Sequence, residues 1–357
     1  MTTKNNIPAG YKDSAVGIIP QEWKVTTLGK LVSITSGESP SLFNLRDIGK
    51  YPYIKVEDMN NCEKYQANSR EYTDDERVVI AKGSIIFPKR GAAITNNKVR
   101  IAACQLYMDS NMMAITPNDL VCGDYLYFKI TYEQLFKIAD TSTIPQINNK
   151  HIIPYKICLP PMEEQRKIAE ILGVWDEAIE KQSRLIEKLE LRKRGLMQRL
   201  LTGRTRLPGF TTPWQKVKLG EIFKERNETK CEHLPLLSIT ADRGVILQSE
   251  SDKKDTSNDD KSKYKRICLN DIGYNTMMMW QGRSALSAME GIVSPAYTIV
   301  TPKVEVDPLF ISELIKQPRA VYDFWTHSQG LVGDTLNCKF HDFSQVKVAI
   351  PSHPEQK

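Results

Sequence analysis

The sequence contains the motif WKVTTLGKL at residues 23–31 and repeats it as WQKVKLGEI at residues 214–222. Both copies read W-x4-L-G-x-(L/I), and they are offset by 191 residues, from 23 to 214. A second pair has the same offset, because LPPMEEQR at residues 159–166 corresponds to IPSHPEQK at residues 350–357. Two short matches that lie far apart in the chain and share one offset indicate a duplicated structural unit.

The middles of the two copies diverge. The segment GSIIFPKRGAAITNN, which starts at Gly83, only loosely parallels NDIGYNTMMMWQGRS, which starts at Asn270. Likewise, AITP ending at Pro117 parallels IVTP ending at Pro302. A duplicated scaffold with dissimilar middles indicates two modules that are built alike and read different things.

Each copy has the pattern of a mixed α/β (α+β) fold. Short apolar runs bounded by turn residues, such as residues 83–87 and 346–350, predict strands. The stretches 125–130 and 309–315 predict one helix in each copy.

The clearest helical signal lies between the copies. Pro160 and Pro161 precede an acidic first turn, and no proline interrupts the chain before Gly203, a predicted C-cap. Apolar residues recur at spacings of three and four, which predicts a helix of about 40 residues, roughly 60 Å long, with a heptad seam that needs a partner helix. The predicted subunit-interface residues are Leu172, Trp175, Ile179, Ile186, Leu189, Leu196 and Leu200.

The bulk properties and motifs point away from chemistry in this chain. It has 357 residues, a formal charge of +6, and seven scattered cysteines without a CxxC pair. No phosphate loop, GxGxxG or HExxH motif is present, so we expect no catalytic residues, bound metal or cofactor. Ser294-Pro-Ala-Tyr297 resembles a methyltransferase tetrapeptide, but its third position is wrong, and a strand-entry turn is the better interpretation. No apolar run is long enough to span a membrane, and we expect a cytoplasmic protein.

Polar and basic residues in the divergent middles are the candidate DNA contacts. Lysine and arginine can neutralise phosphates, arginine can bind guanine, and asparagine can bind adenine. Ordinary solvated loops are the competing interpretation. The corresponding placement in both copies makes the two interpretations nearly equal in weight. The candidates are Lys89, Arg90, Gly91, Asn96, Asn97, Lys98 and Arg100 in the first copy, and Tyr274, Asn275, Thr276, Trp280, Gln281 and Arg283 in the second.

The block PPMEEQRKIAEILGVWDEAIEKQSRLIEKLELRKRGLMQRLLTG, followed by RTRLPGF and a new W-x4-LG start, resembles the central conserved region of type I restriction-modification specificity (S) subunits. IPQEWKVTTLGKL and TSTIPQINNKHIIPYKICLPP are similarly typical of the two ends of a target recognition domain in that family. The resemblance implies recognition domains at 1–160 and 207–351, a conserved coiled-coil helix at 161–206, and a stub of a second conserved helix at 352–357. That second helix, which usually packs antiparallel on the first, is missing at the C-terminus.

The resemblance implies a non-catalytic DNA-binding subunit. Each recognition domain would read one half of a bipartite double-stranded DNA target, and the central helix would space the domains and dock methyltransferase (M) subunits. S-adenosylmethionine, ATP and Mg²⁺ would be bound by these M subunits and a restriction (R) subunit. A second S chain or S fragment would cover the unpaired helix.

Two alternatives remain at this point. A self-contained DNA methyltransferase or nuclease with a fused reading domain would need the methyl-donor or phosphate-loop motifs that are absent. A coiled-coil interaction protein without a DNA role would leave the two globular copies unexplained.

Overall fold

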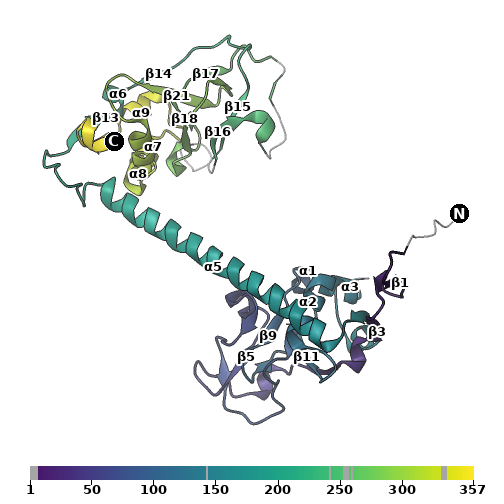
Figure 1. Cartoon of the computed structure of the whole chain (residues 1–357). Helices are drawn as coiled ribbons and strands as arrows, with labels where there is room; N and C mark the ends of the chain where they lie inside the picture. Colours follow the sequence, from purple (N-terminus) through teal and green to yellow (C-terminus); the bar gives the residue numbers. More distant parts are fainter. Residues whose placement is uncertain (1–6, 142–143, 241–242, 252–256, 259, 331–335) are drawn as a thin grey trace. The chain divides into compact units, whose positions relative to one another are not determined.

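The computed structural model describes residues 7–141, 144–240, 243–251, 257–258, 260–330 and 336–357 (Figure 1). The chain divides into two compact units, Met1–Arg184 (unit 1) and Leu185–Lys357 (unit 2). Their boundary falls inside the long helix α5 (Met162–Leu200). The division rests on contacts alone, so the domain boundaries expected from the sequence stay predictions.

Unit 1 is built around a five-stranded sheet. The strands lie in the order β4 (Val32–Ser36), β11 (Met112–Pro117), β8 (Ile85–Pro88), β9 (Arg100–Ala102) and β6 (Tyr65–Gln66). All neighbours are antiparallel except β6 and β9.

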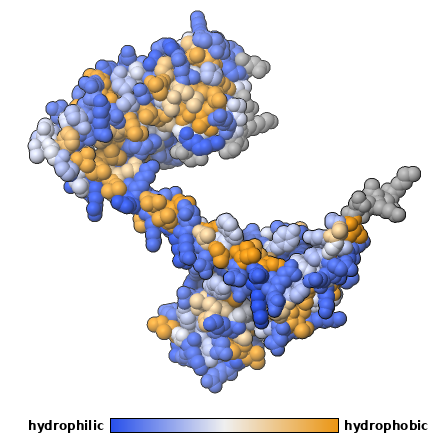
Figure 2. All heavy atoms as spheres, in the orientation of Figure 1, coloured by the Kyte–Doolittle hydropathy of each residue, from blue (hydrophilic) through white to orange (hydrophobic). Residues whose placement is uncertain are grey.

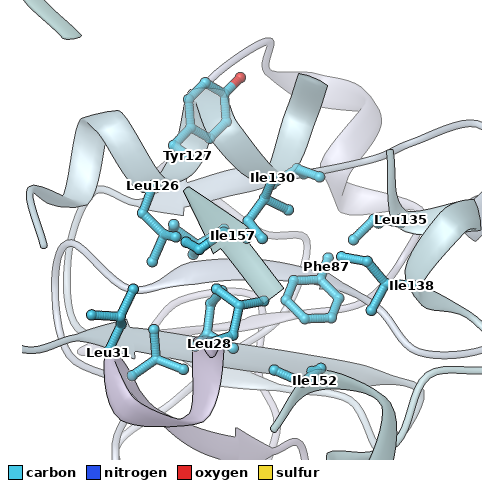
Figure 3. Close-up of a cluster of buried hydrophobic side chains, with 14 of the residues drawn as sticks. Leu28, Leu31, Phe87, Leu126, Tyr127, Ile130, Leu135, Ile138, Ile152 and Ile157 are labelled. Atoms are coloured by element: carbon cyan, nitrogen blue, oxygen red, sulfur yellow. The ribbon is translucent and has the colours of Figure 1, made fainter. Parts of the chain in front are cut away.

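The central strands are apolar on both faces because each face covers a separate core. Ile85 and Phe87 of β8 pack in one cluster, and Ile86 between them packs in another. Successive side chains of a strand point to opposite faces, so a run without polar alternation fits a strand buried on both sides. In Figure 3, Phe87 lies in the first cluster with Leu126 and Ile130.

Short elements complete unit 1. Its helices are η1 (Leu28–Lys30), η2 (Pro40–Leu42), η3 (Asp58–Asn61), α1 (Ala92–Thr95), α2 (Gly123–Glu133), α3 (Leu135–Ile138) and α4 (Asn149–Ile152). Its smaller sheets are β1 (Tyr11–Lys12) with β2 (Ile19–Pro20), β3 (Lys24–Thr27) with β12 (Lys156–Leu159), and β10 (Tyr107–Met108), β5 (Tyr51–Ile54) and β7 (Tyr72–Thr73).

Unit 2 has a four-stranded antiparallel sheet in the order β14 (Phe223–Glu225), β21 (Tyr297–Pro302), β18 (Ile272–Asn275) and β19 (Ser284–Leu286). Three strand pairs accompany it: β13 (Gln215–Lys218) with β22 (Lys347–Ile350), β15 (Leu237–Thr240) with β16 (Gly244–Leu247), and β17 (Lys265–Ile267) with β20 (Gly291–Val293). Its helices are α6 (Leu219–Ile222), η4 (Gln248–Glu250), η5 (Met279–Gln281), α7 (Pro308–Leu314), α8 (Pro318–His327), α9 (Phe340–Gln345) and α10 (His353–Gln356).

The sequence repeat is also a repeat of backbone contacts. Lys24 pairs with Leu159 in unit 1, and Gln215 pairs with Ile350 in unit 2, each position shifted by 191 residues. Pro117 pairs with Val32 in the first sheet, as Pro302 does with Phe223 in the second. The two predicted helices are present as α2 and α7, and Ser294–Tyr297 forms the expected turn into β21.

The segment after each terminal strand pair is attached in the same way. The indole Nε1 of Trp23 donates to the carboxylate of Glu164 at 2.9 Å, and that of Trp214 donates to Glu355 at 3.5 Å. We call these contacts the two helix seats, because Glu164 lies in the first turn of α5 and Glu355 lies in α10.

Helix α5 is long and continuous, as the heptad pattern predicted. Its first turns pack into unit 1, where Gln165 and Ala169 are buried. Beyond them most of its large apolar residues are exposed, with Trp175 at 65% and Ile179 at 63%, whereas Met197 and Leu200 near its end are half-buried. Figure 2 shows hydrophobic residues among the hydrophilic ones along this helix. Among the described residues, no helix is long and apolar enough to cross a membrane.

Candidate nucleic-acid interface

The candidate residues occupy equivalent places in the two units. In unit 1 they follow β8, flank α1 and reach β9; in unit 2 they begin with the last two residues of β18, pass through η5 and end just before β19. The turn before the last strand has the same hydrogen bonds in both. Asn97 N donates to Ile94 O at 3.0 Å, and Gly282 N donates to Met279 O at 2.8 Å. The loose sequence parallel between the two middles is therefore a structural correspondence.

In unit 1 the loop after β8 is fixed by its backbone. Gly91, with a φ of +80°, donates its N–H to Pro145 O at 2.9 Å, and Lys89 O accepts from Ile147 N at 2.9 Å. This leaves the exposed side chain of Arg90 available to a ligand. Lys89 is half-buried, and burial together with the neighbouring Arg90 charge lowers its pKa. Two adjacent cations that repel each other favour an anionic ligand.

The remaining candidates of unit 1 have unequal roles. Asn96 is exposed, and Lys98 Nζ donates to the amide oxygen of Asn60 at 2.7 Å. Asn97 connects the loop to the neighbouring helices, because its side chain donates to Thr131 O at 2.8 Å and accepts from Leu135 N at 2.9 Å.

Arg100 corrects the sequence expectation. Its guanidinium donates to the carbonyls of Met59 at 2.9 Å, Cys62 at 2.8 Å and Val99 at 2.9 Å. A guanidinium that binds three backbone oxygens holds the fold and is not presented to a base edge.

Unit 2 requires a larger correction. Tyr274 is fully buried, and its ring stacks on Phe343 of α9 at 5.0 Å, so it belongs to the core and does not face DNA. Asn275 accepts from Met277 N at 3.0 Å, and Thr276 donates to Ala296 O at 2.8 Å.

Trp280 is half-buried, and its indole donates to Met277 O at 3.0 Å. The exposed candidates of unit 2 are therefore Gln281 and Arg283.

The sequence reasoning missed a second segment beside each loop. In unit 1, Arg90 and Asp140 each form a β-bridge with Gln146. In unit 2, Gln329 forms the equivalent bridge with Asn337, and Cys338 N donates to Thr276 O at 2.8 Å. The only sequence signal is that Gln146 and Asn337 share the 191-residue offset. Each candidate interface is therefore formed by two segments of the chain, the loop after the central strand and the bridged segment beside it.

The comparisons with known proteins agree with this architecture. A family model described as the type I restriction modification DNA specificity domain matches residues 20–191. The MjaIX specificity subunit of Methanocaldococcus jannaschii is 30% identical over 51% of this chain and 45% of its own length. The MjaVIII specificity subunit of the same organism is 24% identical over 57% of this chain and 50% of its own length.

This chain thus spans about half the length of the curated relatives it matches. Among solved structures, the S subunit of a type I restriction-modification system from M. genitalium has the same fold. It superposes with a TM-score of 0.60 at 16% identity, covering 100% of this chain and 89% of the other.

Proposed function

We propose that this chain is a type I restriction-modification specificity subunit and reads a bipartite double-stranded DNA target. Each unit reads one half of the target through the loop after its central strand. Helix α5 connects the two reading units, sets the separation of the half-sites and docks methyltransferase subunits. The chain performs no chemistry; S-adenosylmethionine, ATP and Mg²⁺ act on the methyltransferase and restriction subunits.

One observation carries this proposal. The two units share their strand registers and terminal attachments, yet the loops after β8 and β18 present different side chains at equivalent positions. Unit 1 exposes Arg90 and Asn96, whereas unit 2 exposes Gln281 and Arg283. Because arginine, asparagine and glutamine discriminate bases in the major groove, equal scaffolds with unequal exposed loops are what two different half-sites require.

The proposal is tested by selection from a random duplex library, using the full chain co-expressed with its methyltransferase subunit. We expect enrichment of two short motifs at a fixed separation. One enriched motif would mean that a single unit reads DNA. Enrichment no greater than that of non-specific binding would contradict the proposal.

The apolar stripe of α5 supports the docking role. Trp175, Ile179, Ile186 and Leu189 are all exposed on one helix, although such side chains normally pack in a seam. We expect Ile179→Asp combined with Ile186→Asp to abolish co-purification with the methyltransferase subunit, whereas Lys188→Ala serves as a matched control.

The same stripe is available to the helix of a second S chain or S fragment. Sedimentation velocity of the full chain alone at micromolar concentration tests this, and a strictly monomeric species contradicts self-association.

A further inference from the structure

A pair of exposed aromatic side chains recurs at the same place in both units. In unit 1, Tyr132 is 79% exposed and Phe136 is 46% exposed, at the end of α2 and in α3. In unit 2, Tyr322 is 53% exposed and Trp325 is 49% exposed, both in α8. We call these pairs the aromatic faces of the two units. The function described above uses none of these four residues.

The correspondence of the two faces follows from their neighbours. Phe136 comes directly after the buried Leu135, and Trp325 comes directly after the buried Phe324. Four residues after each aromatic, at Asp140 and at Gln329, begins the β-bridge that borders the candidate loop. Each unit therefore turns one apolar side chain into its core and the next one, an aromatic, outward.

The residue before the exposed tyrosine of each face contacts the turn of the candidate DNA loop. In unit 1, Asn97 binds Thr131 O, and Thr131 immediately precedes Tyr132. In unit 2, Gly282 lies against Val321, which immediately precedes Tyr322; a Cβ at Gly282 would stand 3.0 Å from the Val321 side chain. The turn residue has a positive φ in both units, +49° and +73°.

A cation follows the turn residue in each unit. Lys98 N donates to Ala93 O at 3.4 Å, and Arg283 N donates to Met278 O at 3.5 Å, so the two cations occupy the same position of the same turn. A further cation lies over the exposed tyrosine in each face: Lys129 Nζ is 5.6 Å from the Tyr132 ring, and the Arg319 guanidinium carbon is 5.9 Å from the Tyr322 ring. Each of these cations is ion-paired with a carboxylate of its own helix, Lys129 with Glu133 at 2.7 Å and Arg319 with Asp323 at 3.2 Å.

The repetition indicates what kind of ligand fits. The loops begin differently, with Lys89 and Arg90 after β8 and Thr276 and Met277 after β18, but the faces keep the same chemistry. Each has an exposed tyrosine, a second exposed aromatic, and a cation that follows the turn. A surface kept alike beside two unlike reading loops suits a ligand that is alike at both half-sites. The deoxyribose-phosphate backbone of duplex DNA has that property, with apolar sugar surface for rings and phosphates for cations.

We infer that Tyr132 with Phe136, and Tyr322 with Trp325, are matched contacts to the duplex backbone, which raise affinity without reading sequence. This inference rests on the proposed function, because it assumes that the adjoining loops face DNA. The cations that follow the two turns, Lys98 and Arg283, make the DNA backbone a better fit than the surface of a protein subunit.

The test measures binding of the full chain to a mixed-sequence duplex at several salt concentrations. The variants are Tyr132→Ala with Phe136→Ala, and Tyr322→Ala with Trp325→Ala. We expect each pair to weaken binding about tenfold on every sequence, with an unchanged salt dependence. Lys98→Ala should instead reduce the slope of log affinity against log salt by about one.

Three controls keep the result interpretable. Tyr11→Ala removes an aromatic of similar exposure, 47%, outside the faces and should bind like the wild type. Trp325→Phe retains a ring and should retain binding. Thermal melting identifies a double variant that is merely misfolded. In that case, Trp325→Phe and the four single alanine substitutions at these positions decide the result.

The outcomes separate this inference from the proposed function. If the wild type selects a bipartite target and the aromatic variants bind like the wild type, only this inference is overturned. It is also overturned if the variants keep duplex binding but lose the methyltransferase subunit, because the faces then dock a protein. If the wild type binds no duplex, the proposed function and the inference fall together.

Discussion

The two helix seats occupy equivalent positions in the two units, but the charged groups around their glutamates differ. In unit 1, Glu164 is exposed and receives one hydrogen bond, from Trp23 at 2.9 Å. In unit 2, Glu355 is 8% exposed and accepts hydrogen bonds from two Arg206 nitrogens, Nε and Nη2, each at 2.6 Å, in addition to the one from Trp214. A carboxylate taken out of water needs a charged partner, whereas an exposed one does not. The two seats thus share the tryptophan–glutamate contact, and only the buried glutamate has a charged partner.

The largest effect is expected from replacing the glutamine that follows the glutamate of each helix seat. Gln165, at 1% exposure, accepts from Cys122 N at 2.8 Å and donates to Pro160 O at 2.9 Å. Its counterpart Gln356 makes the same two kinds of bond, at 2.8 and 2.9 Å, but is only half-buried. We expect Gln165→Ala to cost about 2–4 kcal/mol and Gln356→Ala about 1 kcal/mol, because unsatisfied buried groups cost more.

Native-state hydrogen exchange, read on peptides from each unit, measures both changes. Equal losses from the two substitutions would contradict the assigned role of burial.

The next effect sharpens the comparison of the reading loops. We expect Arg90→Ala to relax the motif read by unit 1 and Gln281→Ala to relax the motif read by unit 2, each by about 1–3 kcal/mol at one base position. Library selection with each variant checks this. If both variants relaxed the same half-site, the assignment of one half-site to each unit would be wrong.

A smaller effect separates the two carboxylates. Glu355→Gln should lower the melting temperature of unit 2 by a few degrees, since it removes the charge that Arg206 binds. Glu164→Gln should have almost no effect on unit 1, because its partner is a neutral indole and the side chain is exposed. The two melting curves are the readout, and a larger shift in the Glu164 variant would reverse the comparison.

The smallest effect concerns acid. Hydrogen bonding from Arg206 holds the pKa of Glu355 below its ordinary value of 4.5. A lowered native pKa adds stability above pH 4.5 that is lost as the pH falls through the native value. We therefore expect unit 2 to lose this contribution below pH 4.5, and Glu355→Gln to remove that part of the pH dependence. An unchanged acid transition in the variant would contradict the linkage.

The candidate site was predictable in position but not in detail. The parallel between the segments starting at Gly83 and Asn270 correctly indicated equivalent loops. It could not indicate that Tyr274 is buried, because the ring that covers it, Phe343, lies far along the chain in α9. Nor could it indicate that Arg100 is occupied by the carbonyls of Met59 and Cys62.

The sequence by itself determined the features that depend on local periodicity and on repetition. The 191-residue offset predicted a duplicated unit, and the heptad seam predicted α5; the structure has the duplication in the matching registers of β3 with β12 and of β13 with β22. Only the tertiary structure decided which side chains reach solvent, since that depends on which distant elements pack over them. The fold buries Leu135 and Phe324, for example, and leaves the next residues, Phe136 and Trp325, exposed.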